Sequence, residues 1–240
     1  MKRMNGPLFA AIAMVLALAS ARAADGEWQF KLTPYAWAMG LDGDIGAAGK
    51  TVPVDVKFTD ALKDLKLAGM VAAEANNGTW GIVADAAYLK LSSDSSTPVG
   101  NVGVEVEEWI IQGALTYRIV KSEKTTLDIG AGARSMELNT DISTGLGTAT
   151  TTQSWVDPLL YARVRQQFGE RCFGVVAGDI GGFGVSSDLT WQLTAAAGYS
   201  FTKSVSMLIG YRYLDYDYDK DGFVFKVASS GIALGLQFDL

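Results

Sequence analysis

The sequence contains no histidine, the side chain that most acid–base catalysis uses. Ser-His-Asp and Cys-His arrangements are therefore excluded, and no paired-carboxylate motif stands out in their place. Cys172 is the only cysteine, so it cannot form an internal disulfide. Without a base to activate its thiol, we expect Cys172 to be a small packing residue and not a nucleophile. The chain is predicted not to be an enzyme and to use no cofactor.

A second set of chemically capable residues consists of charges on otherwise small or polar strand faces. Both signs are present, so they could fill the inside of a barrel with salt bridges, or line a pore that selects ions by charge. We favour salt bridges, because opposite charges can pair. Pairing in one layer would plug the lumen, whereas separated patches around water would allow conduction. This predicted lumen cluster comprises Glu74, Asp85, Arg134, Asp157, Arg163, Arg165 and Arg212.

Four aspartates alternate along the chain at Asp215, Asp217, Asp219 and Asp221. Alternating oxygen ligands are typical of calcium loops, but the closing bidentate glutamate of such a loop is missing. We therefore expect a solvated acidic loop, with a cation site bridging to lipopolysaccharide as the alternative. No metal site is predicted elsewhere.

These residues lie in segments that alternate between apolar and small or polar positions. In 232–240, for example, every second residue is apolar, which places one apolar face on a strand. The ten predicted strands are 28–40, 66–76, 79–91, 102–119, 126–139, 155–167, 172–179, 189–201, 205–217 and 223–240. Short turns alternate with longer connections at 41–65, 92–101, 140–154, 180–188 and 218–222, a rhythm typical of outer-membrane barrels.

Aromatic residues gather at the ends of these strands, where the two interfaces of a bilayer would lie. The predicted aromatic girdle comprises Trp80, Tyr88, Trp109, Tyr117, Trp191, Tyr199, Phe201, Tyr211 and Tyr213. The fold predicted is all-β, a closed antiparallel transmembrane β-barrel of ten strands. Eight strands would follow if 66–76 and 172–179 were not strands, and a soluble β-sandwich is the alternative architecture.

Export is predicted by residues 1–23, which have the three parts of a cleaved signal peptide. A basic start is followed by an apolar run, 8–19, and by a small-x-small cleavage site at 21–23. The run is shorter than the ~20 residues of a membrane-spanning helix. Removal leaves one domain, 24–240, with 17 basic and 26 acidic residues and a net charge of −9. This charge is unsuited to nucleic acid, and we expect the bacterial outer membrane as the destination.

Four stretches resemble a family of uncharacterised bacterial outer-membrane β-barrel proteins. They are 32–37 (LTPYAW), 178–185 (GDIGGFGV), 187–191 (SDLTW) and 210–215 (GYRYLD). The resemblance implies a small barrel in the outer membrane. The last strand also resembles the C-terminal signal read by barrel-assembly machinery, with Phe238 and Leu240 as its assembly residues, although Leu240 stands where phenylalanine is commoner.

Two functions are compatible with these observations. The first is a structural or surface-interaction barrel with a largely filled polar lumen, in contact with outer-membrane lipid and lipopolysaccharide. The alternative is a narrow passive channel for ions or small solutes, and a carrier that opens sideways to the bilayer is a third. We favour the filled barrel because the bulky residues Leu159, Tyr161 and Leu208 are expected to point inward. One chain can close such a barrel, so no oligomer is required.

Overall fold

The computed structural model describes residues 28–47, 49–97, 100–144 and 147–240, so the predicted signal peptide, 1–23, lies outside the described residues. Its helical segments include none with the length and hydropathy to cross a bilayer. Ten long strands form the wall: β1 (Gln29–Ala47), β3 (Leu65–Asn76), β4 (Trp80–Thr97), β5 (Gly100–Lys121), β6 (Thr125–Thr144), β7 (Gly147–Gln167), β8 (Cys172–Gly182), β9 (Leu189–Ser200), β10 (Val205–Lys220) and β11 (Phe223–Asp239).

Each of these strands pairs antiparallel with its neighbours in sequence, and β11 pairs with β1 to close the barrel. Closure pairs every long strand on both sides near the turns 77–79, 122–124, 168–171 and 201–204, whereas residues 147–158 of β7 pair with β6 alone. The prediction of a ten-stranded antiparallel barrel is confirmed, and the eight-strand alternative is wrong. Both of the strands on which that alternative depended, β3 and β8, pair on both sides.

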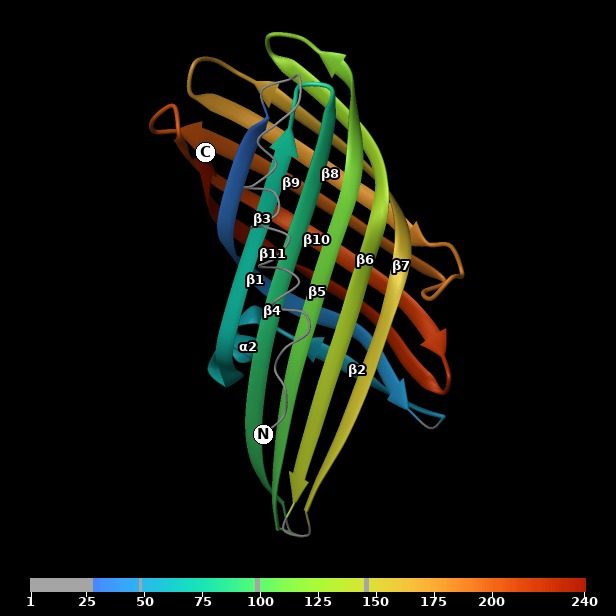
Figure 1. Cartoon of the computed structure of the whole chain (residues 1–240). Coiled ribbons are helices and arrows are strands. Elements are labelled where there is room, and N and C mark those ends of the chain that lie inside the picture. The colour runs from blue at the N-terminus through green and yellow to red at the C-terminus, as the bar shows by residue number, and fades with distance from the viewer. Residues whose placement is uncertain (1–27, 48, 98–99, 145–146) are drawn as a thin grey trace.

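The two ends of the barrel differ. At one end, which we call the turn end, lie the turns 77–79, 122–124, 168–171 and 201–204 together with the start of β1 and the end of β11. Gly78 takes a positive φ of 85° in the first of these turns, as the Asn-Gly sequence predicts. At the other end, the extended end, β4 to β7 reach furthest (lower end of Figure 1).

Most of the predicted long connections are wrong, because the strands continue through them. In 140–154, β6 and β7 remain paired up to Thr144 and Gly147, and the Ser/Thr-rich segment 148–154 is strand. Threonine has a high strand propensity, so polarity there does not indicate a loop. The connection 92–101 likewise continues β4 and β5.

The first connection has structure of its own. The short strand β2 (Lys50–Val56) pairs with the extended-end half of β1, and the helix α2 (Phe58–Asp64) follows it. The helix contacts β1 and β4 and has no buried residue. It lies against the wall and contributes no buried residue to the lumen.

The alternation of apolar and polar residues along the strands reverses partway between the turn end and the extended end, so that the apolar face changes from outward to inward. In β10 the odd-numbered residues from Val205 to Tyr213 are apolar and face outward. Beyond Tyr213 the pattern is reversed, because Leu214, Tyr216 and Tyr218 face inward, and the odd-numbered outward positions 215 and 217 are aspartates. Outward apolar residues near the turn end are strongly exposed, which suits contact with lipid. Near the extended end the outer face is polar and the interior is apolar, as in a protein surrounded by water.

Candidate functional site: the lumen

The extended-end half of the lumen is a packed hydrophobic core. Trp155 stacks on Tyr218 at 4.3 Å between ring centroids and lies edge-on to Tyr216 at 5.9 Å. Met136 of β6 and Leu214 of β10 both point into the lumen and are fully buried. The core comprises Trp37, Met39, Met70, Ala87, Ile110, Met136, Leu138, Trp155, Leu214, Tyr216, Tyr218, Phe223, Phe225 and Val227. This half of the lumen therefore departs from the polar lumen that the sequence predicted.

On the turn-end side of this core a hydrogen-bonded layer crosses the lumen; we call it the polar layer. Arg134, 0% exposed, forms an ion pair with Asp179 and donates to Gln112 Oε1 at 2.9 and 3.1 Å. It also donates to Thr190 Oγ1 at 2.8 Å. Asp179 in turn accepts from the amides of Gln112 at 3.1 Å and Gln192 at 3.4 Å. These acceptors hydrogen-bond the buried Arg134 guanidinium, and the ion pair with Asp179 means that its charge is not buried unpaired.

The polar layer continues through Gln192 to the opposite side of the wall. Gln192 Oε1 accepts from Arg212 at 2.7 and 3.0 Å, and Arg212 forms an ion pair with Asp85 at 3.1 Å. Tyr35 donates its hydroxyl to Asp85 at 2.9 Å. The Arg212 guanidinium also lies 4.6 Å from the centre of the Trp37 ring, so Arg212 connects the polar layer with the hydrophobic core.

A second charged group lies nearer the turn end. Arg163 binds Glu74 at 2.7 and 2.8 Å and Asp128 at 2.8 Å. Asp128 also accepts from Arg118 at 2.7 Å. Within the predicted lumen cluster, Arg163 thus pairs with Glu74 and Arg212 pairs with Asp85, and the two pairs lie at different levels of the lumen.

Arg134 pairs with none of the carboxylates of the predicted lumen cluster. Arg134 and Asp157 are opposite each other in the β6–β7 register, yet Arg134 pairs with Asp179 of β8. Asp157 instead accepts from the backbone N–H of Ser187 at 2.7 Å and from its hydroxyl at 2.6 Å. Asp157 therefore anchors the β8–β9 connection, where Gly182 and Phe183 take positive φ angles.

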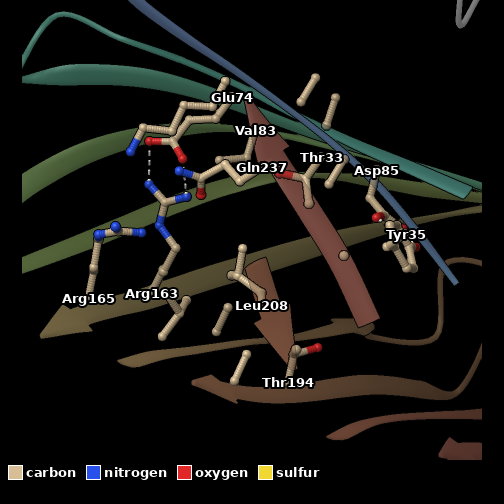
Figure 2. A pocket seen from close by; sticks show the side chains of 18 of the residues that line it. Thr33, Tyr35, Glu74, Val83, Asp85, Arg163, Arg165, Thr194, Leu208 and Gln237 are labelled. Atoms are coloured by element: carbon tan, nitrogen blue, oxygen red, sulfur yellow. Dashed lines mark hydrogen bonds and ion pairs between the residues drawn. The ribbon is translucent and has the colours of Figure 1, made fainter. Parts of the chain in front are cut away.

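A cavity of about 420 Å³ occupies the lumen between the polar layer and the turn end. Figure 2 shows Glu74, Arg163 and Arg165 together at one end of this cavity, and Tyr35 with Asp85 at the other. Arg165 lies 3.5 Å from the centre of the Phe173 ring. The residues placed at its turn-end mouth by strand position include Gln29, Asn76, Thr126 and Gln237.

The predicted girdle residues all face outward, in two groups. Near the turn end, Trp80 and Tyr117 contact each other, as do Tyr199 and Phe201. About eight residues further along the strands, Tyr88 contacts Trp109 and Trp191 stacks on Tyr213, with Tyr211 next to them in β10. The phase reversal of the alternation begins just beyond the second group.

The four aspartates occupy the β10–β11 hairpin, and most of them belong to strand and not to a loop. Asp215, Asp217 and Asp219 face outward on β10, and Asp221 takes a positive φ of 55° in the turn. Lys226 lies 3.0 Å from Asp217 and 4.0 Å from Asp219. Within the described residues, no three acidic, histidine or cysteine side chains are grouped so as to hold a metal ion.

At the C-terminus, Phe238 faces outward and is opposite Leu32 and Val205, and the backbone N–H of Leu240 donates to Phe30 at 2.9 Å. Cys172 is exposed on the outer face, so it does not pack inside the barrel as its small size suggested.

Sequence reasoning missed the hydrophobic core and several members of the polar layer, including Gln112, Asp179 and Gln192. A signal for the core is present in β10 and β11, where the apolar positions change parity after Tyr213 and before Ile232. Asp179 gave no such signal, because a single carboxylate on a short glycine-rich strand has no pattern around it.

Neither a protein-family model nor a curated protein sequence matches this chain. Solved structures match it across most of its length. The outer membrane protease OmpT from Escherichia coli aligns with a TM-score of 0.52 at 9% identity, covering 92% of this chain and 100% of OmpT.

Neisserial surface protein A aligns with a TM-score of 0.41 at 10% identity, covering 90% of this chain and 100% of its own. The attachment invasion locus protein Ail of Yersinia pestis, solved with a heparin analogue, has a TM-score of 0.41 at 11% identity with the same coverage of both chains. At these identities the likeness is one of fold, and the likeness to OmpT supports a closed barrel of the outer-membrane type.

Proposed function

We propose that this protein is an outer-membrane barrel of structural or surface-interaction type whose lumen is closed. The observation that carries the proposal is the stacking of two closed levels inside the wall. The polar layer joins β4, β6, β8, β9 and β10 through side-chain hydrogen bonds. The hydrophobic core fills the lumen on the extended-end side of the polar layer. Water and ions would have to disrupt both levels to cross.

The location is supported by the predicted signal peptide and by the outer face of the wall. Apolar side chains lie between the two aromatic groups, as expected of a barrel in contact with lipid. The turn end would then face the periplasm and the extended end the cell exterior. Exposed members of this apolar band include Leu115, Ile129, Val156, Leu160, Val176, Leu193, Ile209, Ile232 and Leu234.

A surface-interaction role is supported by the extended end. Beyond the second aromatic group the strands continue with polar outward faces. Lys90 donates to Glu105 at 2.6 Å and to Glu107 at 2.8 Å across β4 and β5. This end would rise above the bilayer as a rigid, hydrogen-bonded wall, where lipopolysaccharide headgroups or external partners could contact it.

The channel alternative is supported by the cavity, which shows that the turn-end half of the lumen is not filled. It requires a path past Arg134 and Trp155, which are 0% and 6% exposed. The carboxylates Glu74, Asp85 and Asp179 are each paired with an arginine, so they are poorly placed to act as a ring that selects ions.

Single-channel conductance of the refolded protein, 24–240, in a planar bilayer tests the proposal at two salt concentrations. A folded but silent barrel is the expected result. Folding should be verified in the same preparation by resistance to unfolding in detergent. Reproducible steps whose size scales with salt would overturn the closed lumen and favour the channel.

A further inference from the structure

The charges that line the cavity do not balance. Five basic side chains line it, namely Lys31, Arg118, Arg163, Arg165 and Arg212. Glu74, Asp85 and Asp128 bind three of these, Arg118, Arg163 and Arg212. Lys31 and Arg165 form no ion pair or side-chain hydrogen bond with any residue that the structure describes.

The nearby carboxylates Glu74 and Asp239 form no ion pair with Lys31 or Arg165 in the described residues. Glu74 is opposite Lys31 in the β1–β3 register but binds Arg163 with both of its oxygens. Asp239 is opposite Lys31 in the β1–β11 register and accepts from the Gln237 amide at 2.9 Å, without an ion pair to Lys31. The Lys31 ammonium and the Arg165 guanidinium thus face the cavity with N–H donors available for a ligand.

Arg165 is held in place by packing and not by an acid. Its guanidinium lies over the Phe173 ring, and the ring occupies space left by Gly198, where a Cβ would overlap it. Stacking fixes the plane of the guanidinium while leaving its N–H groups free to bind. Such a preorganised cation loses little side-chain freedom when it binds an anion.

The wall of the cavity formed by β8 to β11 is mostly apolar, and it begins next to Arg165, whose cross-strand neighbour in β8 is Val175. Figure 2 shows Leu208 across the cavity from Glu74, with Thr194 beyond it. Pockets that bind small molecules typically have volumes of ~300–1,000 Å³ and combine mostly apolar walls with a few fixed polar groups. The apolar wall consists of Val175, Ala177, Ala196, Leu208, Gly210 and Ala233.

We propose that this cavity binds a small amphipathic anion that enters from the turn end. Its carboxylate or phosphate group contacts Lys31 and Arg165, and its short apolar body lies along Leu208, Val175 and Ala196. The binding chemistry follows from the cavity alone. The turn end faces the periplasm in the proposed function, so the ligand would come from the periplasm, and this part alone rests on the proposed function.

The test is isothermal titration calorimetry of the refolded barrel in phosphatidylcholine nanodiscs, with empty nanodiscs as the blank. Hexyl phosphate and hexanoate serve as probes, because they present the two anionic groups on the same apolar body. Inorganic phosphate and hexanol each supply one half of this chemistry. We expect saturable binding of one hexyl chain per barrel for at least one of the two anions, and much weaker binding of inorganic phosphate and hexanol.

Variants locate the site. Arg165→Gln and Lys31→Gln should each weaken binding by about tenfold or more, because each removes a charge-assisted hydrogen bond. Ala196→Phe should block the apolar wall and abolish binding. Arg171→Gln is the matched control, since Arg171 is exposed in the turn 168–171 and does not line the cavity.

Equal affinity of the wild type and the Lys31→Gln/Arg165→Gln double variant would overturn the proposal, as would the absence of saturable binding by both anions. A stronger response to hexyl phosphate would indicate a phosphate ester as the ligand class, and a stronger response to hexanoate a carboxylate. Failure of binding is distinguishable from failure of the closed lumen, because a conducting barrel would be detected in the bilayer whether or not the anions bind.

Discussion

Replacement of Arg134 by methionine should destabilise the barrel more than any surface arginine replacement. Arg134 is fully buried and binds Asp179, Gln112 and Thr190. Methionine keeps much of the apolar stem but removes the guanidinium, which leaves the Asp179 carboxylate buried without a cation. Breaking a buried pair in this way costs about 3–5 kcal/mol.

This cost corresponds to a decrease of roughly a hundred- to several thousand-fold in the folding equilibrium constant. Reversible urea or guanidinium unfolding in lipid vesicles, followed by tryptophan fluorescence, measures it. Arg171→Met is the matched control, because the Arg171 side chain is exposed and donates one long hydrogen bond, to the Tyr199 hydroxyl at 3.4 Å. We expect less than about 1 kcal/mol for this control.

The double variant Arg134→Met/Asp179→Leu separates charge burial from packing. Removing both partners leaves no unpaired charge, so it should recover a large part of the stability lost by Arg134→Met. The reasoning would be refuted if Arg134→Met cost no more than Arg171→Met, or if the double variant were less stable than the sum of its single changes.

Three other predictions concern the wall and its orientation. Trp155→Ala should destabilise the barrel by about 3–5 kcal/mol in the same unfolding assay, because it leaves a cavity between stacked rings in the hydrophobic core; a cost below about 1 kcal/mol would contradict that packing. In variants that retain one tryptophan, brominated lipid tails should quench Trp80 and Trp109 strongly and Trp155 weakly, and equal quenching would contradict the reversed alternation. Cys172, which is exposed near the turn end, should react with a membrane-impermeant maleimide only after the outer membrane is permeabilised, so labelling of intact cells would reverse the proposed orientation.

The wall of the barrel could be predicted from sequence because its evidence is local. Period-two alternation specifies a strand with two different faces, and Asn77-Gly78 specifies a tight hairpin. These signals gave ten strands whose starts at the turn end agree closely with the structure. Closure then follows from the cost of an open edge, and an even number of strands lets the first and last strands pair antiparallel.

The strand ends at the extended end were mispredicted for a physical reason. The Ser- and Thr-rich segment 148–154 resembled a loop because it is polar and mostly exposed to water, although its backbone stays paired with β6. The reversal after Tyr213 contained this information, because a strand that passes from lipid into water must exchange its apolar face.

The partners of the lumen charges depended on non-local geometry. Adjacent-strand pairing predicts neighbours such as Arg134 and Asp157, but the stagger of a closed barrel decides which side chains meet across the lumen. Ser187, which lies in a connection, satisfies Asp157 and leaves Arg134 to Asp179. Lys31 and Arg165 likewise form no ion pair with Glu74 or Asp239. Glu74 binds Arg163, and Asp239 accepts a hydrogen bond from Gln237.

In the closed barrel proposed here, the lumen is accessible from the turn end only as far as the polar layer. Cysteine accessibility in a Cys172→Ser background measures this, with Thr194→Cys lining the cavity and Met136→Cys in the core. A small water-soluble methanethiosulfonate should modify the cysteine at 194 rapidly in the folded barrel and leave the cysteine at 136 unmodified until unfolding. Modification of both at similar rates would show water throughout the lumen and contradict the closed barrel.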